Sequence, residues 1–194
     1  MPAHVSPVSI WNQAMGWLGA NLITSFDDNT VESNLGDANY ANIRNAVLEE
    51  TTWSFALKRV ELPALVATEL GYGNAFQLPT DCITLVRAYK DSNMRGADTL
   101  VYAVEDKKIL TDNGACFIKY VFEQEDTQRF SSNFTQALAY RIASDMAIPL
   151  SKSTALQKQY LGLYQMRLMD ASATDGQQSR NQEVNVLWPN VPLA

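Results

Sequence analysis

Apolar residues at helical spacing mark the beginning of the chain. Ser6-Pro7 is a typical helix start, because Ser is favoured as N-cap and Pro at the first helical position. Gly19 is a typical stop. A second helix is expected after a cap at Asn29 or Thr30, although Gly36 interrupts its pattern and glycine disfavours a helix interior. The pattern leaves open whether this second segment is one helix or two.

Two more helices are expected towards the end of the chain. In the stretch 137–153, apolar residues recur every four positions and form one edge of a helix that ends near Pro149. A new helix is expected to start at Ser153 or Thr154, with Gln157 completing a capping box with Thr154. The apolar face of this last helix, which includes Leu161, is too broad for a surface helix. Two neighbours are therefore expected to cover it.

The stretch 137–153 also carries a second stripe, made only of small side chains: Ala139, Ala143 and Ala147. Small side chains allow another backbone to approach closely, because helix separation depends on the residues at the contact. We expect these three alanines to lie against a neighbouring helix, either of the same chain or of a second copy.

Residues 53–129 have the pattern of strands rather than helices. Runs of β-branched and aromatic residues predict a small antiparallel sheet with strands at 82–89, 99–104, 108–111 and 115–122. Asn113-Gly114 lies between two such runs and predicts a hairpin, because both residues tolerate positive φ. The run 82–89 is expected to place four side chains on one face, namely Ile83, Leu85, Arg87 and Tyr89. The stretch 67–81 is rich in Gly, Asn and Pro and is expected to be irregular.

These elements predict an α+β fold, an antiparallel bundle of about four helices with an inserted small antiparallel β-sheet and an extended C-terminal arm. The expected segments are N-terminal helices, a sheet sub-domain, a helical pair and the arm, over 1–52, 53–129, 130–176 and 177–194. The arm is polar and then apolar, without a helical period. A solvated tail would gain nothing from its apolar side chains, so we expect it to bind a partner or a neighbouring subunit through Val186, Leu187, Trp188 and Val191.

Composition and charge narrow the class of protein. With 46% hydrophobic and 19% charged residues, the chain has the composition of a soluble globular protein, and we expect no membrane anchor and no secretory signal. The net charge is −6, and only Lys58-Arg59 and Lys107-Lys108 are adjacent among fifteen basic residues. Because nucleic-acid affinity comes mostly from clustered Lys and Arg, nothing in the sequence predicts a nucleic-acid-binding site.

Candidate chemistry is scarce. Cys82 and Cys116 lie in apolar strand-like runs typical of buried free thiols, and with His4 as the lone histidine they cannot form a typical zinc site. His4 lies too near the N-terminus to support a Ser-His or Cys-His mechanism. We therefore expect no catalytic residues, no metal and no cofactor. Acidic pairs occur at Asp27-Asp28, at Glu49-Glu50 and in the cluster of Glu123, Glu125 and Asp126, where solvated surface charge is the simplest interpretation.

The ordered motifs resemble a known family. "WNQAMGWLGANLITSFDDNT" is similar to the opening helix and loop of the head-to-tail adaptors of short-tailed phages, the tail tubular protein A family. "NAVLEETTWSFALKRVEL" resembles their second helix and strand entry, and "FQLPTDCITLVRAY" resembles their Leu-Pro-x-Asp strand start. The segment that begins "ALAYRIASDMAIPLSKS" is similar to their C-terminal helical pair. The resemblance covers roughly residues 8–180.

The resemblance implies a structural virion protein rather than an enzyme. Members of this family form a ring, typically of twelve copies, between the portal and the tail nozzle, a tail tubular protein B-like protein. DNA passes through the lumen without sequence-specific binding, and the virion is assembled in the host cytoplasm. Such head-to-tail contacts are heterologous and close into a cyclic ring. A net negative charge suits a conduit that must not grip DNA.

Two alternatives remain open at this point. The first is an envelope glycan hydrolase associated with the phage tail, which would use a carboxylate pair such as Glu123 and Asp126. The second is a protein–protein interaction module unrelated to phages. Genes for a portal and a nozzle beside the gene for this chain would exclude the second alternative.

Overall fold

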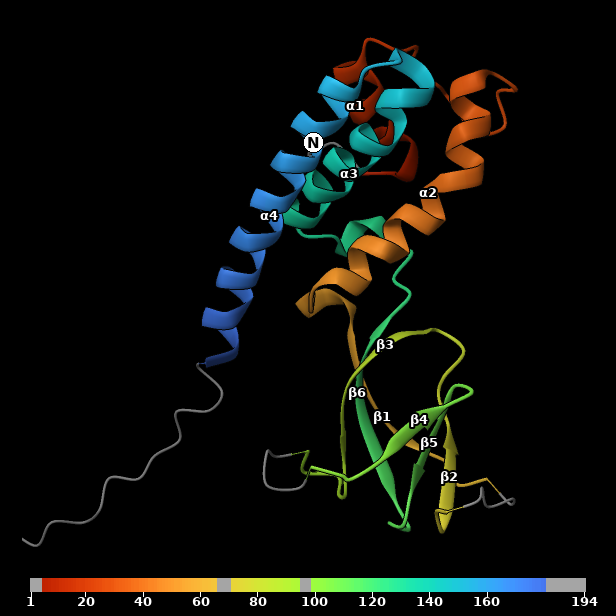
Figure 1. Cartoon of the computed structure of the whole chain (residues 1–194), viewed down its shortest axis with the longest axis vertical. Helices are drawn as coiled ribbons and strands as arrows, with labels where there is room; N and C mark the ends of the chain where they lie inside the picture. The colour runs from red at the N-terminus through yellow and green to blue at the C-terminus, as the bar shows by residue number, and fades with distance from the viewer. Residues whose placement is uncertain (1–4, 66–70, 95–98, 181–194) are drawn as a thin grey trace, which may run out of the picture.

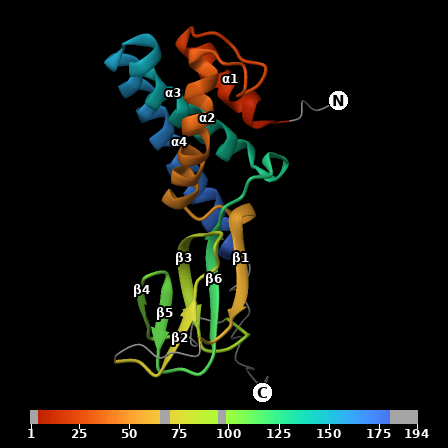
Figure 2. The ribbon, with the colours of Figure 1, turned by 90° about the vertical axis from the view of Figure 1, so that its right-hand side faces the viewer.

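The helices and the strands of the molecule occupy opposite ends. The computed structural model describes residues 5–65, 71–94 and 99–180. Figures 1 and 2 show the helices gathered in a helical lobe (residues 5–50 and 132–180) and the strands in a sheet lobe (residues 57–122). The chain crosses between the lobes twice, before the first strand and after the last. This arrangement confirms the α+β prediction.

The described residues form four α-helices: α1 (Pro7–Leu18), α2 (Val31–Glu50), α3 (Ser132–Ser151) and α4 (Thr154–Arg180). Local capping explains where they begin. The Ser6 hydroxyl accepts a hydrogen bond from the Ser9 N–H, and the Thr30 hydroxyl accepts one from the Ser33 N–H. Gly19 ends α1 in the left-handed conformation, at φ 69°. The expected helix starts and the Gly19 stop are confirmed.

The second helical segment is one continuous helix, and Gly36 has a packing role in it. A Cβ at position 36 would lie 2.5 Å from a ring carbon of Phe26 and 3.2 Å from the indole of Trp11. The Phe26 ring therefore lies directly over the backbone of α2, which only a residue without a side chain permits. The glycine that weakened the helix prediction is required by close packing.

Helix α3 is the centre of the helical lobe, because it packs against each of the other three helices. It continues past Pro149 to Ser151 and ends at Lys152 in the left-handed conformation. The predicted capping box at Thr154 is wrong, because the Ser153 hydroxyl caps α4 by accepting a hydrogen bond from the Leu156 N–H. The prediction of two covering neighbours is wrong at Leu161, which stays exposed together with Met166 and Met169.

Helix α4 also extends further than expected. It runs through Arg180, so residues 177–180, which were assigned to the arm, belong to the helix. The polar composition after Asp175 was interpreted as the end of the helix, yet a helix can also be polar on all its sides. The boundary expected at 176/177 is therefore wrong.

The strands form two three-stranded antiparallel sheets instead of one. Their orders are β1-β6-β3 and β2-β5-β4, formed by β1 (Leu57–Leu62), β2 (Asn74–Gln77), β3 (Cys82–Tyr89), β4 (Ala103–Glu105), β5 (Lys108–Thr111) and β6 (Cys116–Phe122). The expectation that 67–81 is irregular is wrong, because β2 lies within it and pairs with β5. The run 99–104 contributes only the short strand β4.

The hairpin predicted at Asn113-Gly114 is also wrong. Strands β5 and β6 belong to different sheets, and neither turn residue has a positive φ. The Asn113 side chain instead donates a hydrogen bond to the carbonyl of Ala115, which shapes a crossing between the sheets. The two-residue hairpin lies at Asp106-Lys107, where both residues have positive φ and join β4 to β5.

Strand β3 does not keep one simple alternation. Its pairing with β6 shifts register between Cys82 and Thr84 and between Leu85 and Arg87. Ile83 therefore packs against the core of the helical lobe, whereas Leu85 packs against the core between the two sheets. The prediction that four residues of this strand share one face is wrong for this physical reason.

None of the helices in the described part of the chain combines the length and the hydropathy that a membrane-spanning helix needs.

Candidate functional site

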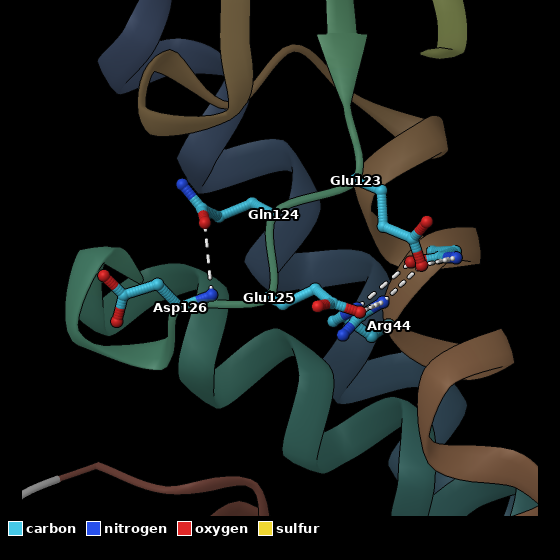
Figure 3. Close-up of polar contacts among 6 residues, drawn as sticks. Arg44, Glu123, Gln124, Glu125 and Asp126 are labelled. Atoms are coloured by element: carbon cyan, nitrogen blue, oxygen red, sulfur yellow. Dashed lines mark hydrogen bonds and ion pairs between the residues drawn. The ribbon is translucent and has the colours of Figure 1, made fainter. Parts of the chain in front are cut away.

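The junction between the helical lobe and the sheet lobe contains a buried arginine with two acidic partners. Arg44 of α2 is 5% exposed and donates a hydrogen bond of 2.6 Å from Nη2 to Oε1 of Glu123, just after β6. The amide of Asn45 donates to the same oxygen at 2.9 Å. Glu125 lies 3.6 Å from the guanidinium (Figure 3). A buried arginine is tolerated when carboxylates pair with it, so these contacts fix β6 against α2.

Aromatic side chains pack at the same junction. Phe134 of α3 lies at the centre, with ring centroids 5.0 Å from Trp53, 5.1 Å from Phe55 and 4.6 Å from Phe130. The Trp53 indole donates a 3.0 Å hydrogen bond to the carbonyl of Val47 near the end of α2. The junction therefore combines the ion pair of a buried arginine with a cluster of edge-to-face rings, a geometry that favours a fixed orientation of the two lobes.

Glu123 and Asp126, the carboxylate pair of the hydrolase alternative, each contact a different basic residue. Figure 3 shows the side chains of Glu123 and Asp126 on opposite sides of the segment, with Glu123 towards Arg44 and Asp126 away from it. Asp126 accepts a hydrogen bond from the Gln128 N–H at the start of the short 3-10 helix η3 (Thr127–Arg129) and pairs with Arg129 at 3.4 Å. A glycosidase pair must face a common sugar from two sides. Nothing in this geometry favours that arrangement.

The other acidic pairs also serve local structure. Asp28 accepts hydrogen bonds from the backbone N–H groups of Thr24 and Ser25, and these bonds lower the pKa of its carboxyl group. Glu50 pairs with Arg141 at 3.3 Å and so joins α2 to α3. These contacts close a loop and hold two helices together.

The three alanines of the small-residue stripe are fully buried by the rest of the same chain. Ala139, Ala143 and Ala147 have no exposed surface. Next to them on α3, Tyr140 stacks on Trp17 of α1 with ring centroids 4.8 Å apart, and the Ser144 hydroxyl donates to the carbonyl of Gln157 in α4. The stripe therefore lies inside the helical lobe, where it offers no free surface to a second copy.

The cysteines are free thiols in the structure. Cys116 is buried, and burial raises its pKa to about 11. Burial, with a smaller contribution from the carboxylate of Asp81, also raises the pKa of Cys82 to about 11. Both thiols are therefore protonated at neutral pH and are poor nucleophiles. Among the described residues, no group of His, Cys, Asp and Glu has the arrangement of a metal site.

The expected arm residues, namely Val186, Leu187, Trp188 and Val191, lie outside the described residues. Their role as a binding segment stays a prediction. His4 also lies outside the described residues.

One cluster of basic residues could not be predicted from the sequence. The antiparallel pairing of β1, β6 and β3 places Arg59 opposite Lys119, and Lys119 opposite Arg87. Directly opposed residues of neighbouring strands share a face, so three cations that are far apart in sequence form one row. The intervening pairs, Val60 with Ile118 and Ala88 with Ile118, point to the other face, where Ile118 and Ala88 are buried in the core between the sheets. The cationic row therefore lies on the outer face of this sheet.

The chain was compared with protein-family models and with curated proteins, and neither comparison found a match.

Proposed function

We propose that this chain is a structural virion protein, the head-to-tail adaptor of a short-tailed phage. It forms a ring between the portal and the tail nozzle and lines the DNA conduit. The ordered motifs along residues 8–180 support the proposal from the sequence. The structural observation that supports it best is the fixed junction formed by Arg44 and Glu123.

A ring imposes a geometric requirement on its subunit. Head-to-tail contacts close into a ring when each interface repeats the same rotation, and the rotation repeats when each subunit keeps the same shape. The molecule has two lobes, and a variable angle between them would change that shape. The 2.6 Å contact between the buried Arg44 and Glu123, together with the rings around Phe134, supports a fixed angle between the lobes.

A ring subunit must also be a rigid wedge, and in this proposal the helical lobe has that role. In this proposal the four helices act as one antiparallel bundle. The fully buried alanines at 139, 143 and 147 bring its members close together. The exposed apolar residues of α4, Met166 and Met169, are then available to a neighbouring subunit. The protein needs no cofactor or metal for this role.

The partners in this proposal are further copies of the chain, typically twelve in all, the portal and a nozzle protein. DNA passes through the lumen without sequence-specific binding. Assembly takes place in the host cytoplasm, and the product is located at the head–tail junction of the virion.

Assembly with the portal tests the proposal. The full chain is mixed with purified portal particles of the same phage and followed by light scattering and negative-stain microscopy. The expected result is a ring of adaptor density on one end of each portal particle. A chain that stays monomeric and never joins portal particles would contradict the proposal. A chain that is monomeric by itself and joins the portal agrees with it, because assembly then starts on the portal.

A further inference from the structure

The cationic row, Arg59, Lys119 and Arg87, is an unusual feature in a chain of net charge −6. Like charges directly opposite one another on neighbouring strands destabilise a sheet. Strand spacing of about 4.8 Å places the backbone positions of all three residues within roughly 10 Å. The structure thus concentrates positive charge on a small area of one sheet face.

No carboxylate of the described chain neutralises this row. Within residues 5–65, 71–94 and 99–180, none of the three cations forms an ion pair or a side-chain hydrogen bond, although Glu61 lies two residues from Arg59 on the same face. Other basic residues behave differently, since Arg44 pairs with Glu123, Lys58 with Asp81 and Arg141 with Glu50. The row therefore keeps its charge available to an external anion.

The repulsion between the three cations affects the pKa of the central residue, Lys119. Burial, with added repulsion from Arg59 and Arg87, lowers the pKa of Lys119. Lys119 is half-buried, whereas Arg59 and Arg87 are exposed at its two sides. An anion bound along the row would relieve the repulsion between the three charges.

We propose that the cationic row binds the phosphate backbone of a nucleic acid. Phosphodiesters offer a linear series of negative charges, and guanidinium groups bind phosphate oxygens in a bidentate manner. A second copy of the chain fits less well. In its acidic cluster, Glu123 and Glu125 already pair with Arg44, and Asp126 pairs with Arg129.

The contact is weak by construction, because three phosphate contacts in an acidic protein make a non-specific site that DNA can leave quickly. Binding by the single chain does not depend on a ring. Placing the row along a DNA conduit rests on the proposed function, whereas the binding test does not.

Fluorescence anisotropy with a labelled duplex of random sequence, 20 base pairs long, tests this inference on the full chain. The affinity is expected to fall with salt with a log–log slope of about −2.7, the value for three phosphate contacts. A fivefold rise in salt concentration then weakens binding by roughly 80-fold. The variant Arg59→Gln/Arg87→Gln/Lys119→Gln is expected to lose at least tenfold in affinity in low salt and to show a slope near zero.

A matched variant controls for net charge. Arg129→Gln/Lys158→Gln/Arg167→Gln removes three cations outside the sheet lobe, one from η3 and two from α4. It is expected to bind the duplex like the original chain. Removal of mutually repelling charges leaves the fold intact, which thermal melting of both variants verifies.

Three results would overturn the inference: no binding of the duplex by the original chain in 20 mM salt, equal losses in the two triple variants, or a change of oligomeric state in the row variant with unchanged DNA binding. The last result would assign the row to a protein partner. If only ring assembly on the portal fails, the proposed function is contradicted. The inference that the cationic row binds DNA is then unaffected.

Discussion

Arg44 and Glu123 lie 79 residues apart in the chain, yet Nη2 of the buried arginine is 2.6 Å from Oε1 of the carboxylate. The arginine side chain is 6% exposed and the glutamate side chain 38%. The desolvation cost therefore falls almost entirely on Arg44. Loss of the carboxylate leaves a buried cation poorly compensated, so the pair is energetically asymmetric.

Glu123→Ala is expected to lower the free energy of unfolding by about 2–3 kcal/mol, somewhat less than breaking a fully buried pair, because Glu123 is partly exposed. Arg44→Met is expected to cost less, since it removes the buried charge and leaves a carboxylate that water can reach. Urea denaturation of the two variants measures the difference. A larger loss for Arg44→Met would show that the arginine stabilises chiefly by packing.

The control for this experiment is Arg129→Ala. Its ion pair with Asp126 joins side chains that are 68% and 51% exposed. Exposed pairs contribute about 0–1 kcal/mol, so this substitution is expected to leave the urea midpoint nearly unchanged.

Gly36→Ala is expected to destabilise the helical lobe by about 1–3 kcal/mol, because the new Cβ would lie 2.5 Å from a carbon of the Phe26 ring. Gly16→Ala is the matched control in α1, since a Cβ there meets nothing within 4 Å. Helix propensity alone then predicts a gain of about 0.5–1 kcal/mol. Thermal melting of both variants should show shifts of opposite sign, and equal shifts would exclude the Phe26 contact as the cause.

Ala143→Leu is expected to disturb packing inside the single chain, because Ala143 has no exposed surface. Overpacking of this kind costs about 1–3 kcal/mol. Ala41→Leu, at an exposed position of α2, is the control and is expected to be nearly neutral. The free energy of unfolding of the isolated chain is the measurement. An unchanged value together with a defect in assembly would place the stripe at a contact between subunits.

The sequence predicts those structural features that depend on contacts between residues close together in the chain. Helix starts depend on residues three or four positions apart, such as Ser6 with Ser9 or Thr30 with Ser33, and these were predictable. The α+β class follows from the change of period along the chain. The capping box at Thr154 failed because Ser153 offers the same chemistry one residue earlier.

The features that were missed depend on pairing across the fold. Asn113-Gly114 carries a strong local hairpin signal, but the strands on its two sides pair with other strands. The cationic row needs the register of three strands, since Arg59, Arg87 and Lys119 are scattered in the sequence. The pairing of Arg44 with Glu123 could not be predicted from the sequence either. In each case the deciding contact is between residues far apart in the chain, which a local pattern cannot report.

Deletion of the residues after Asn181 tests the arm. The deleted segment lies outside the described residues, and its apolar residues around Trp188 predict a docking segment. We expect the shortened chain to keep its melting temperature and to dissociate from portal particles during gel filtration. Normal retention on the portal would make the segment an ordinary tail, and Trp188→Ala in the full chain would then also have no effect.

Asp81 predicts a pH dependence of stability. Its carboxylate accepts hydrogen bonds from Lys58 Nζ at 2.7 Å and from the Tyr120 hydroxyl at 3.1 Å, which tie β1 and β6 to the start of β3. Burial raises the pKa of Asp81, but these two partners outweigh burial and leave the pKa below its usual value of 3.8. A folded-state pKa below the unfolded one gives stability that is complete above the unfolded pKa and is lost as the pH falls through the folded pKa.

Asp81→Asn is therefore expected to be less stable than the original chain at pH 7, by up to about 1 kcal/mol because Lys58 is largely solvated. The difference should stay constant down to about pH 5 and shrink below pH 4, where the original chain also loses its carboxylate charge. Urea denaturation of both proteins between pH 7 and pH 3 measures it. Asp37→Asn, at an exposed position of α2, is the control and should show little difference at any pH. A difference for Asp81→Asn that does not change with pH would mean that the asparagine disturbs packing, and that the charge of Asp81 contributes nothing.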